Sequence, residues 1–193
     1  MPGTREATPP IGLGLSGSWI QLEPVTEATA LDFAEIDAHR GLNPVMGVQR
    51  VAGSSPYAPS MLVRDKKSGR AVGIVENFAQ PGGTAAFVVY IDPLRGRAGY
   101  GTEAICLYLS AMFDGGARRI TAEVLSFNTD TVGILRKVGF PPQARMREHV
   151  YVGGRFWDLV IYSFDRHDWD RVITRYRRKL PGGDRAPAAL GPS

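Results

Sequence analysis

Residues 92–104, Asp92-Pro-Leu-Arg-Gly-Arg-Ala-Gly-Tyr-Gly-Thr-Glu-Ala104, follow an apolar run and precede an apolar helical stripe. The run Ala85-Ala-Phe-Val-Val-Tyr-Ile91 is typical of a buried strand. Over residues 102–113, apolar side chains recur every three or four positions, at Ile105, Tyr108, Leu109 and Met112. Gly115 follows this stripe, as it commonly does at the end of a helix. The stretch therefore predicts a strand, a glycine-rich basic turn and a helix N-terminus.

A turn of this kind can bind an anion. Its glycines let a ligand approach the backbone closely, and successive free N–H groups form an anion-binding concavity. The dipole of the following helix adds partial positive charge at the same place, so phosphate or pyrophosphate is the favoured ligand. The stretch contains neither Gly-Lys-Ser/Thr nor G-x-G-x-x-G after the strand, so neither common nucleotide loop is present. A polar surface turn without a ligand is the alternative at this point.

The composition favours one soluble domain. The chain has 193 residues, of which 44% are hydrophobic and 22% charged. No apolar run approaches the roughly 20 residues that span a bilayer, and the N-terminus lacks the pattern of a secretory signal. We therefore expect a cytoplasmic protein without a membrane partner. The single cysteine, Cys106, excludes an internal disulfide and is predicted to be a packed core thiol.

The excess positive charge lies in one segment. Residues 166–193 hold seven Lys/Arg against three Asp/Glu, whereas the rest of the chain balances at sixteen of each. Without an aromatic and basic sheet surface, this distribution argues against nucleic-acid binding. The three histidines and the cysteine are not spaced as metal ligands, so we expect no metal.

The remaining patterns predict a mixed α/β domain at residues 17–170. Further strands are expected at 18–24, 61–65, 71–78, 119–126, 145–152 and 155–162, and further helices at 26–38, 128–138 and 169–180. Thr26 and Asn128 are the expected N-caps of two helices. Residues 1–16 are expected to be a disordered arm, and 171–193 a basic helix with a tail whose last ten residues are unstructured.

Three motifs occur in a fixed order along the chain. They are Gly96-Arg-Ala-Gly-Tyr-Gly-Thr-Glu-Ala104, then Asn128-x-x-Thr131 with Arg136-Lys-Val-Gly-Phe140, then Arg147-Glu148 with Gly154-Arg-Phe-Trp-Asp158. In this order the chain resembles the GNAT-superfamily N-acetyltransferases over residues 18–170, most closely the Rim-type branch that acetylates ribosomal-protein N-termini. The resemblance implies a central, mostly antiparallel twisted sheet flanked by helices. It also implies acetyl-CoA and an amine acceptor as partners of a monomer or homodimer.

The family's pyrophosphate loop is Gln/Arg-x-x-Gly-x-Gly/Ala. In that register Gly96 takes the first position, so the basic residue is displaced to Arg95 or Arg97. The resemblance further implies that the strand before the loop binds the pantetheine arm. The implied cofactor-binding residues are Phe87, Val88, Val89, Tyr90, Arg95, Arg97, Ala98, Gly99, Tyr100, Gly101, Thr102, Asn128 and Thr131.

Two positions on the helix at 128–138 carry family roles. Asn128 matches an asparagine that contacts pantetheine, and it can equally be a simple N-cap. Many members have a tyrosine at the position of Leu135, where it protonates the departing thiolate. The Rim-type branch commonly lacks that tyrosine and has serine at the position of Thr131. Thr131 is therefore the candidate for hydrogen-bonding the CoA sulfur, and a first-turn helix residue is its alternative.

Acetyl transfer requires a deprotonated amine held close to the thioester carbonyl. Glu76, between Val75 and Asn77 on a predicted strand, is the first candidate base, and Glu148 is the second. A solvated or ion-paired strand residue is the alternative for each. The segment 39–60 is expected to line the acceptor side, and His39 itself is given no chemistry. The sequence thus predicts an acetyl-CoA-dependent N-acetyltransferase for a small molecule or a peptide N-terminus, with a non-catalytic acyl-CoA-binding or regulatory module as the alternative.

Overall fold

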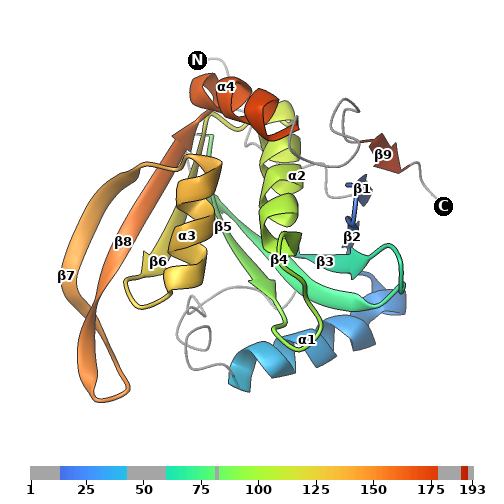
Figure 1. Ribbon diagram of the computed structural model, residues 1–193, viewed down its shortest axis with the longest axis horizontal. Helices are drawn as coiled ribbons and strands as arrows, with labels where there is room; N and C mark the ends of the chain where they lie inside the picture. Colours follow the sequence, from blue (N-terminus) through green and yellow to red (C-terminus); the bar gives the residue numbers. More distant parts are fainter. Residues whose placement is uncertain (1–13, 43–59, 81–82, 178–187, 191–193) are drawn as a thin grey trace.

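The computed structural model describes residues 14–42, 60–80, 83–177 and 188–190. In that part of the chain nine strands form one sheet in the order β7-β8-β6-β5-β4-β3-β2-β1-β9 (Figure 1). All neighbours are antiparallel except β5 and β6. The strands are β1 (Gly14–Ser16), β2 (Ile20–Pro24), β3 (Ser60–Asp65), β4 (Ala71–Gln80), β5 (Thr84–Ile91), β6 (Arg119–Leu125), β7 (Pro142–Val152), β8 (Arg155–Asp165) and β9 (Ala188–Leu190).

Helices cover both faces of this sheet. They are a 3₁₀ turn (Glu27–Thr29), α1 (Ala30–Leu42), α2 (Tyr100–Asp114), α3 (Thr129–Val138) and α4 (Arg166–Arg177). The larger core lies under α2 and α4, where Trp169 packs against Phe113 at 5.9 Å between ring centroids. The smaller core lies under α1 and joins Ile36 to Ile74 and Tyr90. No helix in the described ranges is long and apolar enough to cross a membrane.

The helix ends follow the predicted capping residues. Asn128 Oδ1 accepts the backbone N–H of Thr131 at 3.1 Å, and Gly139 ends α3 in a left-handed conformation at φ 91°. Thr26 and Thr29 form a reciprocal capping box before α1, with Thr26 N–H donating to Thr29 Oγ1 at 2.9 Å. The mixed α/β class is confirmed, and each predicted helix and strand has a counterpart whose ends differ from those predicted. Residues 178–180 of the last predicted helix lie outside the described residues.

The chain termini differ from the prediction. Residues 14–16 and 188–190, expected to be unstructured, form β1 and β9 and pair with each other at the sheet edge. Short strands like these carry little periodicity of their own. β1 pairs with β2, and β9 pairs with β1. α1 also runs on to Leu42, which shortens the expected irregular segment 39–60. The rest of that segment, with Arg50 and Tyr57, and the arm and tail at 1–13, 178–187 and 191–193 lie outside the described residues.

Candidate active site

The site begins where two parallel strands separate. β5 and β6 pair only from Thr84↔Arg119 to Ala86↔Thr121. Beyond this point β5 stays paired with β4 as far as Ile91, while β6 stays paired with β8 as far as Leu125. From Phe87 onward, the edge of β5 that faces β6 therefore has no partner strand within the described sheet. Backbone N–H and C=O groups on this edge remain available to a ligand.

A cleft of about 630 Å³ occupies the gap between the separated strands. One wall is β5 with the loop after it, and the other is the end of β6 with α3. This volume lies in the range of small-molecule and cofactor sites. Most of the predicted cofactor-binding residues line it: Phe87, Val88, Val89, Tyr90, Arg97, Ala98, Gly99, Gly101, Thr102, Asn128 and Thr131. The sequence reasoning missed other lining residues, among them Asp92, Pro93, Ile105, Ile134 and Lys137.

The loop at the end of the cleft presents unpaired backbone donors. The N–H groups of Arg97, Ala98, Gly99, Gly101 and Thr102 donate to no acceptor within the described part of the chain. Tyr100 is the exception, because its N–H donates to Arg97 O at 3.1 Å. These donors lie at the start of α2, where the helix dipole also favours an anion. Unpaired donors of the kind expected for an anion site therefore occur in this loop, except at Tyr100, and the binding of an anion by them stays a prediction.

Glycines permit this loop conformation. Gly99 caps α2 at φ 98°, in the left-handed region that other residues rarely adopt. A Cβ at Gly96 would lie 2.2 Å from Ile91 Cγ2, so only glycine lets the loop fold back on β5. Gly101 brings α2 close to α3, because a Cβ there would meet Ile134 Cδ1 at 3.2 Å.

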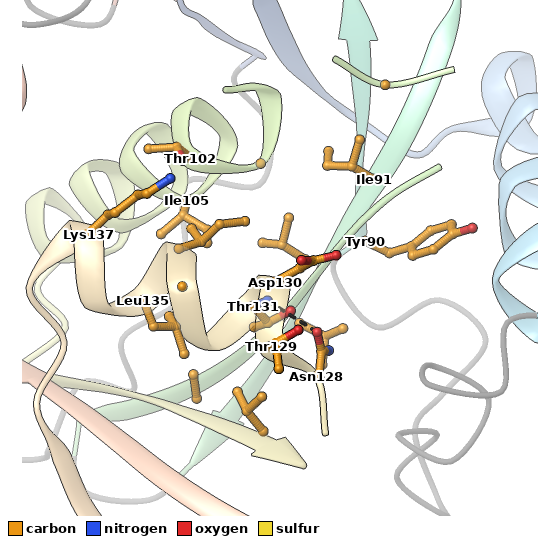
Figure 2. A pocket seen from close by; sticks show the side chains of 18 of the residues that line it. Tyr90, Ile91, Thr102, Ile105, Asn128, Thr129, Asp130, Thr131, Leu135 and Lys137 are labelled. Carbon is orange, nitrogen blue, oxygen red and sulfur yellow. Dashed lines mark hydrogen bonds between the residues drawn. The ribbon is translucent and has the colours of Figure 1, made fainter. Parts of the chain in front are cut away.

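The α3 wall carries several of the polar side chains that line the cleft (Figure 2). Asn128 acts as the N-cap, as its structural alternative predicted. The Thr131 hydroxyl lines the cleft and makes no hydrogen bond to another described residue. Leu135, at the position of the family's tyrosine, is 1% exposed and offers no proton donor. Lys137 extends toward the start of α2, where Thr102 lies.

The helical spacing of α3 explains why Lys137 belongs to the site. Residues 130, 133, 134 and 137 follow the i, i+3, i+4, i+7 pattern and all line the cleft. Following the stripe that begins at Asp130 in the predicted helix would have found Lys137 from sequence. Together with the exposed Arg97, it places two cations at the end of the cleft where the free N–H groups lie.

Two predicted members of the cofactor set face elsewhere. Arg95 forms an ion pair with Glu35 of α1, and its Nε lies 3.3 Å from Asp92 Oδ2, so its guanidinium is directed toward α1. Tyr100 is 4% exposed, and its side chain lies in the core under α2. The structure places neither residue at the cleft.

Glu76, the first candidate base, lies on the sheet face that α1 covers. It stands opposite Val88 of β5, which lines the cleft. Its Oε2 is ion-paired with Arg40 of α1, whose Nη2 also lies 2.5 Å from Asp37. Burial alone would lower the pKa of Arg40, but the hydrogen bonds and charges of Glu76 and Asp37 raise it. Oε1 of Glu76 accepts no hydrogen bond from another described residue.

Glu148, the second candidate, is remote from the cleft. It is exposed and has φ 50° at an irregularity in the β7–β8 pairing, between Met146 and Val150. Its N–H donates to Asp158 Oδ1 at 2.8 Å. This bulge breaks the alternation of side chains that was expected of a regular strand.

The single thiol has no accessible chemistry. Burial raises the pKa of Cys106 to about 12, and the residue is 3% exposed in the core. A core thiol was the prediction from the sequence, and it is confirmed. No cluster of three or more potential metal ligands occurs among the residues that the structure describes.

Solved structures of acetyltransferases share this fold. A GCN5-related N-acetyltransferase from Brucella melitensis superposes with a TM-score of 0.71 at 22% identity, covering 90% of this chain and 88% of that one. Mycobacterium smegmatis RimJ in complex with CoA-disulfide gives a TM-score of 0.64 at 17% identity, covering 86% and 93% of the two chains. Identities this low support the fold alone, including the expected likeness to a Rim-type protein.

Sequence comparisons identify the family. The SPbeta prophage-derived uncharacterized N-acetyltransferase YokL of Bacillus subtilis (strain 168) is 24% identical over 103 residues, 51% of this chain. The match spans only 58% of that relative's length. The acetyltransferase (GNAT) domain profile matches residues 21–141, more than half of the chain and both walls of the cleft. The chain therefore belongs to the GNAT acetyltransferase family.

Proposed function

We propose that this protein transfers an acetyl group from acetyl-CoA to a primary amine of a small molecule or a peptide N-terminus. The observation that carries the proposal is a set of five N–H groups at the start of α2 that have no acceptor among the described residues, at the end of a cleft between separated strands. A diphosphate fits these donors, and Arg97 and Lys137 add cationic charge beside them. The open edge of β5 suits an extended arm that carries its own amides, as pantetheine does.

When bound, acetyl-CoA supplies a thioester whose thiolate leaves readily, so no strong acid is required of the protein. We assign acceptance of the amine proton to Glu76 Oε1, because Oε2 is paired with Arg40 and Oε1 has no partner among the described residues. The amine nitrogen then bonds to the carbonyl carbon as the carbon–sulfur bond breaks. Unpaired N–H groups of β5 stabilise the carbonyl oxygen, and the Thr131 hydroxyl donates to the departing sulfur.

A panel of peptides and small amines incubated with acetyl-CoA and read by mass spectrometry tests the proposal. Acetylated product together with release of free CoA thiol is the expected result. The alternative is a regulatory module that binds acyl-CoA without turnover, and the absence of a proton-donating side chain at Leu135 is compatible with it. Binding of acetyl-CoA without thiol release for any acceptor would favour that module. Absence of acetyl-CoA binding would refute both functions.

A further inference from the structure

The loop between β5 and α2, residues 92–99, is called the anion loop below. Two side chains of α1, one helical turn apart, contact its first turn. Glu35 forms an ion pair with Arg95. His39 Nδ1 lies 2.8 Å from Asp92 Oδ2. Arg95 Nε lies 3.3 Å from the same Asp92 oxygen and joins the two contacts. Because positions i and i+4 share one face of a helix, a single face of α1 makes both contacts. These four residues are called the α1 clamp below.

Asp92 is the centre of the clamp. It is 1% exposed, its Oδ1 accepts the N–H of Leu94 at 2.9 Å, and its carbonyl accepts the N–H of Arg95 at 3.1 Å and of Gly96 at 2.7 Å. Burial alone would raise the pKa of Asp92, but the hydrogen bonds from His39 and Leu94 and the charge of Arg95 lower it overall. An ionised carboxylate thus fixes the turn that leads directly into the free N–H groups of residues 97–99, 101 and 102.

We propose that Glu35 and His39 are positioning residues for acetyl-CoA, acting through Arg95 and Asp92 on the anion loop. This inference rests on the proposed function, since it concerns the affinity of the same cleft for its acyl donor. Glu35 and His39 do not line the cleft, and Arg95 faces α1 instead of the ligand. The clamp keeps the loop in its binding conformation before the ligand arrives. The apparent Kd equals the intrinsic Kd divided by the fraction of molecules in that conformation, so a larger fraction gives tighter apparent binding.

Glu35→Gln separates this role from simple electrostatics. The substitution removes a negative charge near the proposed anion site and breaks the ion pair of Arg95 Nη2, while Arg95 Nε stays beside Asp92. If Arg95 were a direct pyrophosphate ligand, or if charge alone mattered, Glu35→Gln would bind acetyl-CoA as tightly as the parent or more tightly. The clamp predicts the opposite, an increase in Kd of roughly tenfold if the competent loop population falls to about a tenth. The side chain of Glu35 is 52% exposed, so the substitution leaves the core intact.

His39 offers a rescue pair. Asn places an amide N–H where the imidazole Nδ1 lies, whereas Leu keeps bulk without a donor. His39→Asn should therefore bind acetyl-CoA nearly as the parent does, and His39→Leu should weaken binding roughly tenfold. The matched control is Asp32→Asn on the same helix. Asp32 pairs with Arg64 of β3 at 2.8 Å and is 43% exposed, so its replacement removes an equivalent charge without touching the loop.

The measurement is isothermal titration of the full chain with acetyl-CoA, with thermal melts and steady-state kinetics on each variant. The clamp predicts weaker binding for Glu35→Gln and His39→Leu, parental binding for His39→Asn and Asp32→Asn, and parental kcat at saturating acetyl-CoA. Unchanged or tighter binding by Glu35→Gln, or equal loss for the two His39 variants, would overturn it. A parent that does not bind acetyl-CoA would instead refute the proposed function itself.

Discussion

Replacement of Gly99 by Asp and by Asn tests the anion loop with a matched pair. Gly99 is the N-cap of α2 at φ 98°, and a Cβ there would lie 3.1 Å from Trp19 Cζ3. Both substitutions therefore strain the backbone, by about 1–2 kcal/mol, and push against the same indole ring. Asp and Asn tolerate this backbone region about equally and differ mainly in charge. Comparing the two variants cancels the strain and isolates the effect of the added negative charge.

The size of the charge effect follows from the position of Gly99 among the free N–H groups of Arg97, Ala98, Gly101 and Thr102. For the estimate we take a diphosphate with about two negative charges at a separation of roughly 7 Å from the new carboxylate. With an effective dielectric constant of about 40 to 80, the repulsion is roughly 1.2–2.4 kcal/mol. Gly99→Asp should thus bind acetyl-CoA roughly seven- to fiftyfold more weakly than Gly99→Asn.

The assay is isothermal titration of both variants at low and high salt, with circular dichroism melts to confirm that they unfold at the same temperature. The affinity ratio should shrink as salt rises, because screening acts on the repulsion and not on the strain. Equal affinity of the two variants at low salt would show that the pyrophosphate lies elsewhere. A ratio that does not respond to salt would mean that the carboxylate acts through the shape of the loop.

Three further predictions concern single residues. If the Thr131 hydroxyl donates a hydrogen bond to the departing thiolate, Thr131→Val should lower kcat roughly tenfold and leave acetyl-CoA affinity unchanged. Thr131→Ser should keep the parental kcat. Equal kcat values for Thr131→Val and the parent would exclude that role. Glu76→Gln should lower kcat about 10²–10⁴-fold and remove the acidic limb of the pH–rate profile, and an unchanged profile would remove Glu76 from the mechanism. Glu103→Ala should destabilise the fold by about 3–5 kcal/mol in denaturant titrations, because the buried carboxylate accepts the N–H groups of Ser18, Trp19 and Ile20. A loss below about 1 kcal/mol would mean that these donors find other partners.

The part of the site that depends on local chemistry could be predicted from the sequence. The glycine positions, the apolar stripe of α2 and the Asn128 cap act over a few residues, and the structure has each of them. The unpaired backbone donors of the anion loop follow from the same local chemistry. A left-handed glycine sets the start of the helix, and the N–H groups of a first helical turn have no partners within the helix. The separation of β5 and β6 does not follow from local chemistry, and the sequence did not predict it.

The direction of the charged side chains could not be predicted in the same way. Arg95 and Arg97 flank Gly96 symmetrically in sequence, yet one faces α1 and the other faces the cleft. The ion pair with Glu35, some 60 positions away in the sequence, directs Arg95 toward α1. The spacing of the loop residues does not predict that contact. His39 was given no chemistry for the same reason, because its partner Asp92 approaches only in the folded chain. Lys137, by contrast, lies on the helical stripe that begins at Asp130, so the periodicity of the sequence could have indicated it.

Helix α1 connects the two halves of the proposed reaction. Its neighbouring residues His39 and Arg40 hold Asp92 at the start of the anion loop and Glu76 on β4. The loop would bind the donor, and Glu76 would take the proton from the acceptor. A displacement of α1 would therefore disturb both at once, whereas a change confined to His39 or to Arg40 would disturb only one. Donor affinity and the pH dependence of kcat should consequently separate in single variants of these two residues and change together when the packing of Ile36 beneath the helix is disrupted.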